Sequence, residues 1–428
     1  MNLTLLTDLY ELTMMQGYFK NPTNQTVIFD MFYRVNPCGG SFAITAGLEQ
    51  MIEYIENLHF TDDDIEYLRS LHIFEDDFLE YLRSFKFTGD IYAIPEGTVV
   101  FPREPLVKVI APIMEAQLVE TAILNIINHQ SLIATKAARV CYAARGDGIM
   151  EFGLRRAQGP DAGIYGARAA VIGGCAGTSN VLTGQMFNVP VLGTHAHSWI
   201  MSFPDELTAF RTYAKMYPDA CILLVDTYDT LKSGVPHAIQ VFKEMRDAGI
   251  TSKLMGIRLD SGDIAYLSKK ARKMLDEAGF TNAIISASSD LDEYLINSLK
   301  TQGCTVTSWG VGTNLITSSD NPAFGGVYKL AAIKKPGDKE FTAKIKISEN
   351  PEKITNPGNK TVYRIYDKES SKIKADLICL VGETFDPSED LKIFDPISTW
   401  KKSILPAGSY QIREMLVPIF LNGQCVYS

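Results

Sequence analysis

The chain has 428 residues, of which 46% are hydrophobic and 21% charged, a balance typical of a folded protein with a large core and two or three domains. A net charge of −9 argues against a nucleic-acid-binding surface, while leaving room for a local basic pocket that holds a phosphorylated small molecule. Seven scattered cysteines without a C-x-x-C pair indicate reduced thiols, and no apolar run approaches the ~18 residues of a membrane span. The first 19 residues lack the basic start of a signal peptide, so we expect a cytoplasmic protein with no membrane contact.

The first third of the chain mixes helical and strand patterns. Thr7 is the expected N-cap of a helix with acids in its first turn, and a strand is predicted at 27–35. Helical, acid-rich sequence follows over 48–85, and β-type runs lie within 89–110. Residues 115–139 predict one long helix, which should be buried because it is apolar on more than one side.

From about residue 137, apolar strand-like runs alternate with helical patterns. The runs are 221–225, 254–257, 283–285 and 305–309, and each leads directly into polar residues. Helices are expected between them, one of them capped by Asp263. The alternation predicts a parallel sheet covered by helices, with a site at the carboxyl ends of the strands. Because the runs are unevenly spaced, we expect an irregular or incomplete (β/α) barrel-like domain.

After about residue 330, Lys and Glu become frequent and strands replace the alternation. Strands are predicted at 361–366, 377–381 and 416–420. This β-rich region either forms a third domain or packs back on the first part of the chain.

The sequence Gly193-Thr194-His195-Ala196-His197-Ser198-Trp199 concentrates two of the six histidines. It follows the apolar run 189–192, which we expect to be the end of a buried strand. Imidazole is a good nucleophile and changes charge near neutral pH, so one hypothesis is a histidine that acts on a substrate. The alternative is a polar turn that only caps the strand. Asp226, at the end of another predicted strand, could orient such a histidine by accepting from its second nitrogen.

Other polar clusters also follow predicted strands. The segment 258–263 combines an arginine with two carboxylates, which suit a phosphate, ribose hydroxyls or Mg²⁺. The segment 151–161 places two adjacent arginines beside an aromatic ring. The glycine-rich loops 173–180 and 310–314 could bring backbone N–H groups close to an anion, or could be ordinary turns. The phosphate-loop and dinucleotide glycine motifs are both absent, so any nucleotide is bound by another device.

These motifs together resemble the nicotinate phosphoribosyltransferase family, which are type II phosphoribosyltransferases. The resemblance runs from Thr7 to about Ser428, and its most specific segments are 7–10, 151–161, 193–199, 224–229, 258–263 and 310–313. It implies that nicotinate and 5-phosphoribosyl-1-diphosphate give nicotinate mononucleotide and diphosphate, the first step of NAD biosynthesis from nicotinate. It also implies coupling to hydrolysis of ATP to ADP and phosphate. We expect Mg²⁺ to be carried with the diphosphate, and whether protein groups also hold the ion stays open.

The resemblance also implies residue roles. ATP would transiently phosphorylate His197, with Asp226 holding the imidazole, whereas His195 falls at a variable position. Tyr10 from a neighbouring subunit and Phe152 would sandwich the pyridine ring. Nicotinate would be fixed by Thr194 and Arg258. The ribosyl phosphate and diphosphate would be held by Arg155, Asp260, Ser288, Gly312 and Thr313.

The fold implied by the resemblance is a barrel-like α/β domain plus an α+β domain built from both chain ends, acting as a homodimer with active sites at the interface. We expect the barrel-like domain at 137–330, and the composite domain at 1–136 together with a β-rich part at 331–428. Members of the family usually continue with a helical tail where this sequence ends at Ser428, and Ala176 stands where an acidic residue is expected.

Three rival functions differ in testable ways. In nicotinamide phosphoribosyltransferases an aspartate after the Gly-Thr pair would read the amide; here His195 takes that position, and it could attract a carboxylate. Quinolinate phosphoribosyltransferases are a weaker rival, because they decarboxylate their substrate and lack the histidine motif. A non-catalytic homologue that binds pyridine or phosphoribosyl ligands is the third.

Overall fold

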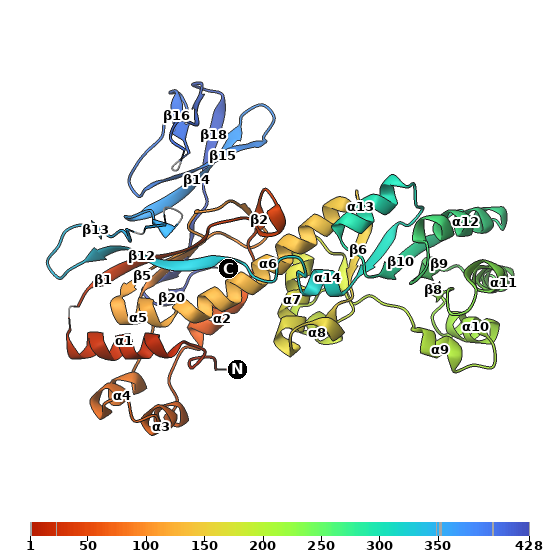
Figure 1. Cartoon of the computed structure of the whole chain (residues 1–428), viewed down its shortest axis with the longest axis horizontal. Helices are drawn as coiled ribbons and strands as arrows, with labels where there is room; N and C mark the ends of the chain where they lie inside the picture. The colour runs from red at the N-terminus through yellow and green to blue at the C-terminus, as the bar shows by residue number, and fades with distance from the viewer. Residues whose placement is uncertain (1, 23, 348, 351–352, 396–397, 428) are drawn as a thin grey trace. The chain divides into compact units, whose positions relative to one another are not determined.

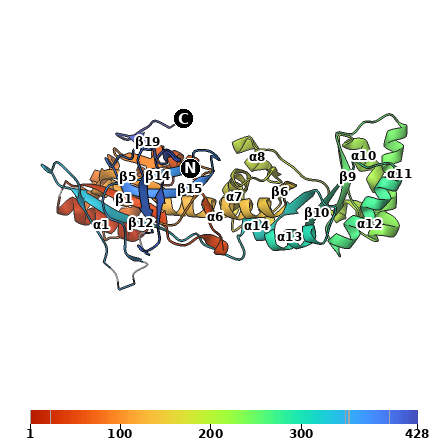
Figure 2. The same cartoon turned by 90° about the horizontal axis from the view of Figure 1, so that it is seen from above.

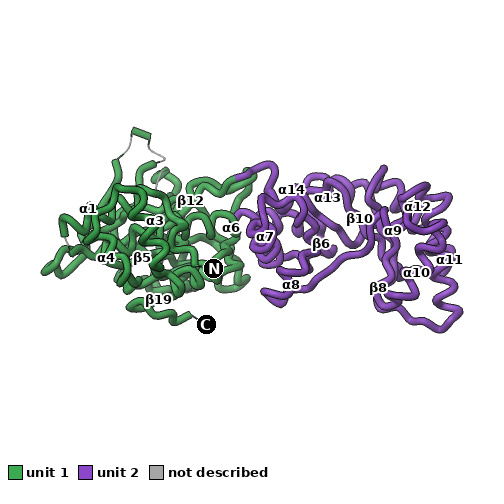
Figure 3. Tube along the Cα trace, turned by 90° about the horizontal axis from the view of Figure 1, so that it is seen from below, with its two compact units in different colours: residues 1–131, 323–428 green, residues 132–322 purple. Residues whose placement is uncertain are grey.

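The computed structural model describes residues 2–22, 24–347, 349–350, 353–395 and 398–427, so the chain end at Ser428 lies outside the described residues. The chain divides into two compact units (Figure 3). One unit combines residues 1–131 with 323–428, and the other consists of residues 132–322. Among the helices of the described ranges, none has both the length and the apolar character needed to cross a membrane.

The first unit is organised around an antiparallel sheet whose strands come from both ends of the chain. Within the described residues the strand order is β13-β12-β1-β5-β3-β19-β20. The early strand β1 therefore pairs with the late strand β12, and β3 pairs with β19. This arrangement confirms the expected α+β fold built from both chain ends. The strands are β1 (Thr26–Tyr33), β3 (Asp90–Ala93), β5 (Val107–Pro112), β12 (Gly326–Lys334), β13 (Thr342–Ala343), β19 (Val417–Leu421) and β20 (Gln424–Cys425).

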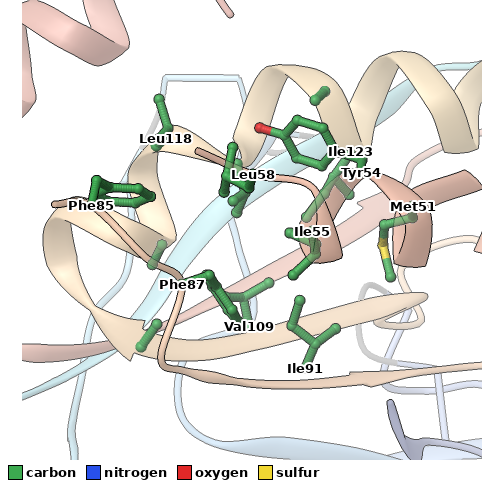
Figure 4. Packing of buried hydrophobic residues seen from close by; sticks show 14 of the residues in the cluster. Met51, Tyr54, Ile55, Leu58, Phe85, Phe87, Ile91, Val109, Leu118 and Ile123 are labelled. Carbon is green, nitrogen blue, oxygen red and sulfur yellow. The ribbon is translucent and has the colours of Figure 1, made fainter. Parts of the chain in front are cut away.

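Helices cover one face of this sheet and supply its core. Tyr54 and Leu58, in and just after α2, lie over Ile91 of β3 and Val109 of β5, and all four side chains are buried (Figure 4). Burial of this apolar surface is the main stabilising contribution to the unit. The helices are α1 (Leu9–Lys20), the short 3₁₀ turn η1 (Pro37–Gly39), α2 (Leu48–Glu56), α3 (Asp62–Ser70), α4 (Asp76–Arg83), α5 (Ile113–Leu118) and α6 (Glu120–Ala143), which contains the boundary between the units.

The β-rich end of the chain packs back on the first part. Lys360, at the start of β14, forms a buried ion pair with Asp30 of β1 at 2.7 Å, and its carbonyl accepts from Lys108 of β5 at 2.9 Å. Arg364 of β14 likewise reaches the carbonyl of Val99 in β4. The smaller sheets are β15-β14-β18, β16-β17 and β2-β4. Their strands are β2 (Ala43–Ile44), β4 (Val99–Val100), β14 (Lys360–Asp367), β15 (Ile373–Leu380), β16 (Leu391–Phe394), β17 (Lys402–Leu405) and β18 (Tyr410–Glu414).

The second unit, all of whose residues are described, contains a parallel sheet of six strands in the order β7-β6-β11-β10-β9-β8. The end strands β7 and β8 do not pair with each other, so the sheet is an open, incomplete barrel, as expected. The predicted runs from 221 to 309 correspond to β8 to β11. The strands are β6 (Gly148–Glu151), β7 (Gly177–Thr178), β8 (Ala220–Leu224), β9 (Leu254–Leu259), β10 (Ile284–Ser289) and β11 (Ser308–Val311).

Helices alternate with these strands, and α10, α11 and α12 lie together beside β8 and β9 (Figures 1 and 2). Asp263 caps α12 by accepting from the Tyr266 N–H at 2.9 Å, which confirms its predicted role. The elements are η2 (Leu154–Arg156), α7 (Pro160–Ile172), α8 (Val181–Phe187), α9 (His197–Met201), α10 (Glu206–Met216), the π-helical turn η3 (Thr230–Gly234), α11 (Val235–Asp247), α12 (Ile264–Glu277), α13 (Glu293–Thr301) and α14 (Thr313–Ile316).

Three local expectations are wrong. Thr7 is not the N-cap of the first helix: Asp8 takes that position, while the Thr7 hydroxyl donates to Leu118 O at 3.5 Å. The predicted helix 115–139 is two helices, because the backbone of Val119 (ψ −8°) ends α5 before α6 begins. The run 189–192 forms only an isolated bridge to Thr178, because the proline within it has no N–H for a longer ladder.

Candidate active site

A cavity of about 640 Å³ opens at the carboxyl ends of the parallel strands in the second unit. Such strand ends are where α/β folds place their sites, because polar loops meet there. The cavity brings together nine of the predicted site residues: Phe152, Arg155, Thr194, His197, Arg258, Asp260, Ser288, Gly312 and Thr313.

The ring of Phe152 packs against β11 at Gly310, a residue without a side chain. Its backbone N–H donates to Val311 O at 2.8 Å, which extends the pairing of β6 with β11. A Cβ atom added to Gly310 would lie 2.5 Å from the Phe152 Cδ2 atom, and one added to Gly312 would lie 3.2 Å from the Phe152 carbonyl oxygen. The glycines of this loop therefore have a packing role, which is to let the Cδ2–Cε2 edge of the aromatic ring lie against β11.

Glu151 orders the loops around this ring, and sequence reasoning assigned it no role. Its buried carboxylate accepts from the Gly153 N–H and from the Thr178 hydroxyl, the latter at 2.6 Å. Burial raises the pKa of Glu151. The available signal was an acidic residue at the end of the otherwise apolar strand sequence Gly-Ile-Met-Glu, because a buried carboxylate needs partners.

Arg258 of β9 supplies a largely buried positive charge. Its Nη1 donates to Thr194 Oγ1 at 2.5 Å and its Nη2 donates to His195 O at 2.9 Å. Its Nε is buried and has no hydrogen-bond partner among the described residues. A guanidinium stays protonated in proteins and carries five N–H donors, so Arg258, which lines the cavity, is a cation with donors left beyond these two bonds.

His195 is a packing residue rather than a charged one. The residue is 9% exposed, and its ring makes an edge contact with Tyr213, with ring centroids 4.6 Å apart. Its Nε2 accepts from the Leu224 N–H at 3.4 Å. Burial lowers the pKa of His195 to about 4, so the imidazole is neutral at pH 7. At this place Arg258 rather than His195 is therefore the cation.

His197, the first residue of α9, is surrounded by three polar side chains. Its Nδ1 is 3.0 Å from Thr227 Oγ1. Its Nε2 lies 3.6 Å from Asp260 Oδ2 and 4.0 Å from Asp226 Oδ1. A distance of 4.0 Å is beyond hydrogen-bond reach. In this structure Asp226 therefore acts on the ring as a nearby charge rather than as the expected acceptor, and Thr227 is a partner that sequence reasoning missed.

The acidic groups are held by contacts between neighbouring strand ends. Asp226 Oδ2 accepts from the Asp260 N–H at 2.8 Å and from the Ser261 hydroxyl at 2.7 Å, while its Oδ1 is buried and has no hydrogen-bond partner in the described chain. Asp260 accepts in turn from the Ser288 hydroxyl. These bonds link the ends of β8, β9 and β10, so the carboxylates near His197 are fixed in place.

Tyr10 is the predicted site residue that lies in the other unit. It is on α1, and its side chain is 47% exposed. Its expected role at the pyridine ring stays a prediction.

Comparisons with known proteins agree along the whole chain. Residues 5–128 match the nicotinate phosphoribosyltransferase N-terminal domain, 148–370 the nicotinate phosphoribosyltransferase family, and 359–428 the corresponding C-terminal domain. The sequence is 52% identical to nicotinate phosphoribosyltransferase of Bacillus subtilis, over 100% of this chain and 86% of that protein. It is 32% identical to the human nicotinate phosphoribosyltransferase, over 98% of this chain and 87% of that one.

Solved structures show the same fold. The crystal structure of human nicotinic acid phosphoribosyltransferase aligns with a TM-score of 0.84 at 28% identity, covering 99% of this chain and 90% of that one. A nicotinate-nucleotide pyrophosphorylase from Pyrococcus furiosus aligns with a TM-score of 0.73 over 99% of this chain and 90% of that one; at 22% identity, this likeness concerns the fold alone.

Proposed function

The chain belongs to the nicotinate phosphoribosyltransferase family, and from that premise we propose that it joins nicotinate to 5-phosphoribosyl-1-diphosphate. The products are nicotinate mononucleotide and diphosphate, and the reaction is coupled to hydrolysis of ATP to ADP and phosphate. This is the first step of NAD biosynthesis from nicotinate.

One observation carries the substrate assignment: a buried guanidinium and a flat aromatic ring line the same cavity. Arg258 keeps N–H donors beyond its two bonds, and the ring of Phe152 lies against Gly310 in the same cavity. A pyridine carboxylate needs both features, a cation for the carboxylate and a ring face for the heterocycle. Thr194 keeps the guanidinium in place through its hydroxyl. The proposal adds Tyr10, from the neighbouring subunit of a homodimer, as the second face.

The phosphoribosyl half of the cavity is polar and contains both signs of charge. Arg155 and Arg156 supply positive charge for the phosphate groups, and Asp260, Ser288 and Thr313 supply hydrogen-bonding groups for the rest. Gly312 allows its backbone to approach the ligand. The transition state is expected to resemble an oxocarbenium ion at the ribose, so the protein's task is to place charge and to stabilise the leaving diphosphate.

Mg²⁺ belongs to this proposal as an ion carried by the diphosphate. Across the described residues there is no group of three or more His, Cys, Asp or Glu side chains arranged to hold a metal ion. Mg²⁺ is often bound through substrate phosphates with only one or two protein carboxylates, and Asp260 and Asp290, which line the cavity, would be the carboxylates within its reach. When bound, the ion would neutralise charge on the departing diphosphate.

His197 is the proposed site of transient phosphorylation by ATP. Its Nε2 faces the carboxylates of Asp226 and Asp260, which favour a proton on that nitrogen. The lone pair then resides on Nδ1, which attacks the γ-phosphorus while the bond to the ADP oxygen breaks. A phosphoryl group adds a charge of about −1.5 to −2 beside the diphosphate site. Water later returns the imidazole to its free form, with release of phosphate.

The remaining parts of the proposal concern organisation. The unit expected at 137–330, which the structure delimits as 132–322, would be the phosphoribosyltransferase domain, and the unit built from both chain ends would present Tyr10 to the partner subunit. The enzyme would act in the cytoplasm on small-molecule substrates, without nucleic acid or membrane partners.

The test is diphosphate release from 5-phosphoribosyl-1-diphosphate with nicotinate or nicotinamide, each with and without ATP. We expect release with nicotinate, stimulated by ATP, and loss of the stimulation in His197→Ala. His59→Ala is the matched control, because His59 is an exposed histidine of the other unit. Release with nicotinamide alone would make the protein a nicotinamide phosphoribosyltransferase, and no release with either base would make it a ligand-binding homologue.

A further inference from the structure

The hydroxyl of Thr227 contacts one nitrogen of His197, the histidine that is phosphorylated in the proposed function. It follows Asp226 directly after β8, and its Oγ1 is 3.0 Å from His197 Nδ1. The two carboxylates near the ring lie on the Nε2 side, at 3.6 and 4.0 Å. Hence the hydroxyl and the carboxylates contact opposite nitrogens, and the hydroxyl is next to the one that has the lone pair.

The segment that carries Thr227 is held rigidly at both ends. A Cβ atom added to Gly234 would lie 1.8 Å from Val225 O, so the end of η3 packs directly on the end of β8. The Asp229 side chain accepts from the Lys232 N–H at 2.9 Å and caps the turn between them. A π-helical turn such as η3 is rare and is frequently found at functional sites. Thr227 is therefore part of a closed, well-braced loop.

Glu206 joins η3, which follows this loop, to the start of α10. It is buried at the start of α10, a short connection after α9, which His197 begins. Its carboxylate accepts from the Ser233 hydroxyl of η3 and is 2.8 Å from the Nδ1 of His237 on α11. These contacts join the start of α10, which follows α9, to η3, which follows Thr227.

We propose that Thr227 is a positioning residue for phosphoryl transfer to His197. In the free enzyme its hydroxyl donates to Nδ1 and keeps the ring proton on Nε2. When Nδ1 attacks the γ-phosphorus and ADP leaves with the bonding electrons, the hydroxyl turns to donate to an oxygen of the transferred group. It gives up no proton at either stage. This inference rests on the proposed function.

A hydroxyl suits the position next to Nδ1 better than a charged side chain does. It can donate to a lone pair or to a phosphoryl oxygen, and it carries no charge. A carboxylate next to Nδ1 would repel the incoming phosphoryl group, and an ammonium group would compete with Nε2 for the carboxylates. The hydroxyl on Nδ1 and the carboxylates on Nε2 thus have complementary tasks.

The test compares Thr227→Val, which removes only the hydroxyl, with Thr227→Ser, which keeps it. The readout is acid-labile phosphohistidine formed from γ-labelled ATP, together with diphosphate release with and without ATP. We expect Thr227→Val to slow phosphohistidine formation and ATP-stimulated turnover about 10- to 100-fold, as for the loss of a hydrogen bond to a charged group. The KM for nicotinate and the ATP-independent release should stay unchanged. Thr227→Ser should restore the wild-type rate.

The control is Thr212→Val, which removes a hydroxyl that bonds within α10 away from the cavity. Nitrogen-15 spectra of histidine-labelled protein give a second readout: Thr227→Val should shift the Nδ1 signal of His197, identified by its loss in His197→Ala. A wild-type rate of phosphohistidine formation in Thr227→Val would overturn the inference, as would an equally slow Thr227→Ser. Wild-type protein that releases no diphosphate would instead refute the proposed function, so the two failures are distinguishable.

Discussion

Replacing Gly310 by alanine tests how the ring of Phe152 is supported. The new Cβ would lie 2.5 Å from Cδ2 and 2.7 Å from Cε2 of that ring, and 3.4 Å from the Ser288 Cβ, so the ring must tilt away from β11. Overpacking of this kind costs about 1–3 kcal/mol of folding free energy. A lost aromatic stacking contact costs about 0.5–1.5 kcal/mol, so the KM for nicotinate should rise about 2- to 13-fold.

The assay measures the KM for nicotinate and the midpoint of thermal unfolding. In a unit of this size, each kcal/mol of lost unfolding free energy lowers the thermal midpoint by about 2–4 °C, so we expect the midpoint to fall by about 2–12 °C. The matched control is Gly148→Ala, the same change on the adjacent strand β6, where nothing lies within 4 Å of the added carbon. If both variants keep the wild-type KM and midpoint, Gly310 does not support the ring and the reasoning fails.

Three further predictions concern other buried groups. Burial raises the pKa of Glu11 to about 7, above its unfolded value of 4.5, so the native state holds this proton and wild-type stability falls as pH rises through that window. Glu11→Gln should therefore be about 1–3 kcal/mol more stable than wild type at pH 8 and equal to it at pH 4. If the difference in urea midpoint between variant and wild type is the same at both pH values, this reasoning is wrong. Gly234→Ala has no room for its Cβ beside Val225 O and should lose more than about 3 kcal/mol; a wild-type melting curve would show that η3 can relax. Asp226→Asn keeps the shape but removes the charge near His197, and should lower acid-labile phosphate about tenfold or more, so an unchanged yield would exclude an electrostatic role.

The fold of the second unit was predictable because its signals are local. Each of the runs 221–225, 254–257, 283–285 and 305–309 contains enough apolar residues for a buried strand, and each ends at a polar cluster. Asp263 caps its helix through a contact three residues away. The lost strand at 189–192 also has a local cause in Pro190, whereas the break at Val119 interrupts a continuous helical pattern and has no such local signal.

The site was predictable in its members but not in its contacts. The motifs identified His197, Asp226 and Arg258, yet the hydrogen-bond partner of the histidine is Thr227. Successive side chains of an extended segment point to opposite sides, so which of two neighbours reaches the ring depends on the rotation of the strand end. Here Asp226 is buried, with 2% of its side chain exposed, and Thr227 meets the ring. Glu151 was missed because its side-chain partner, Thr178, lies on another segment.

The pairing of β1 with β12 has a consequence for how the protein is made. About 290 residues separate Tyr33 from Gly326. At a synthesis rate of roughly 5–20 residues per second, β12 is made about 15–60 s after β1. During this time the whole of 132–322 emerges, and that unit can fold first because its chain is continuous. An unpaired strand edge invites wrong partners. Chaperone dependence and aggregation of nascent chains should therefore concentrate in the N-terminal segment and end only when the last strands leave the ribosome.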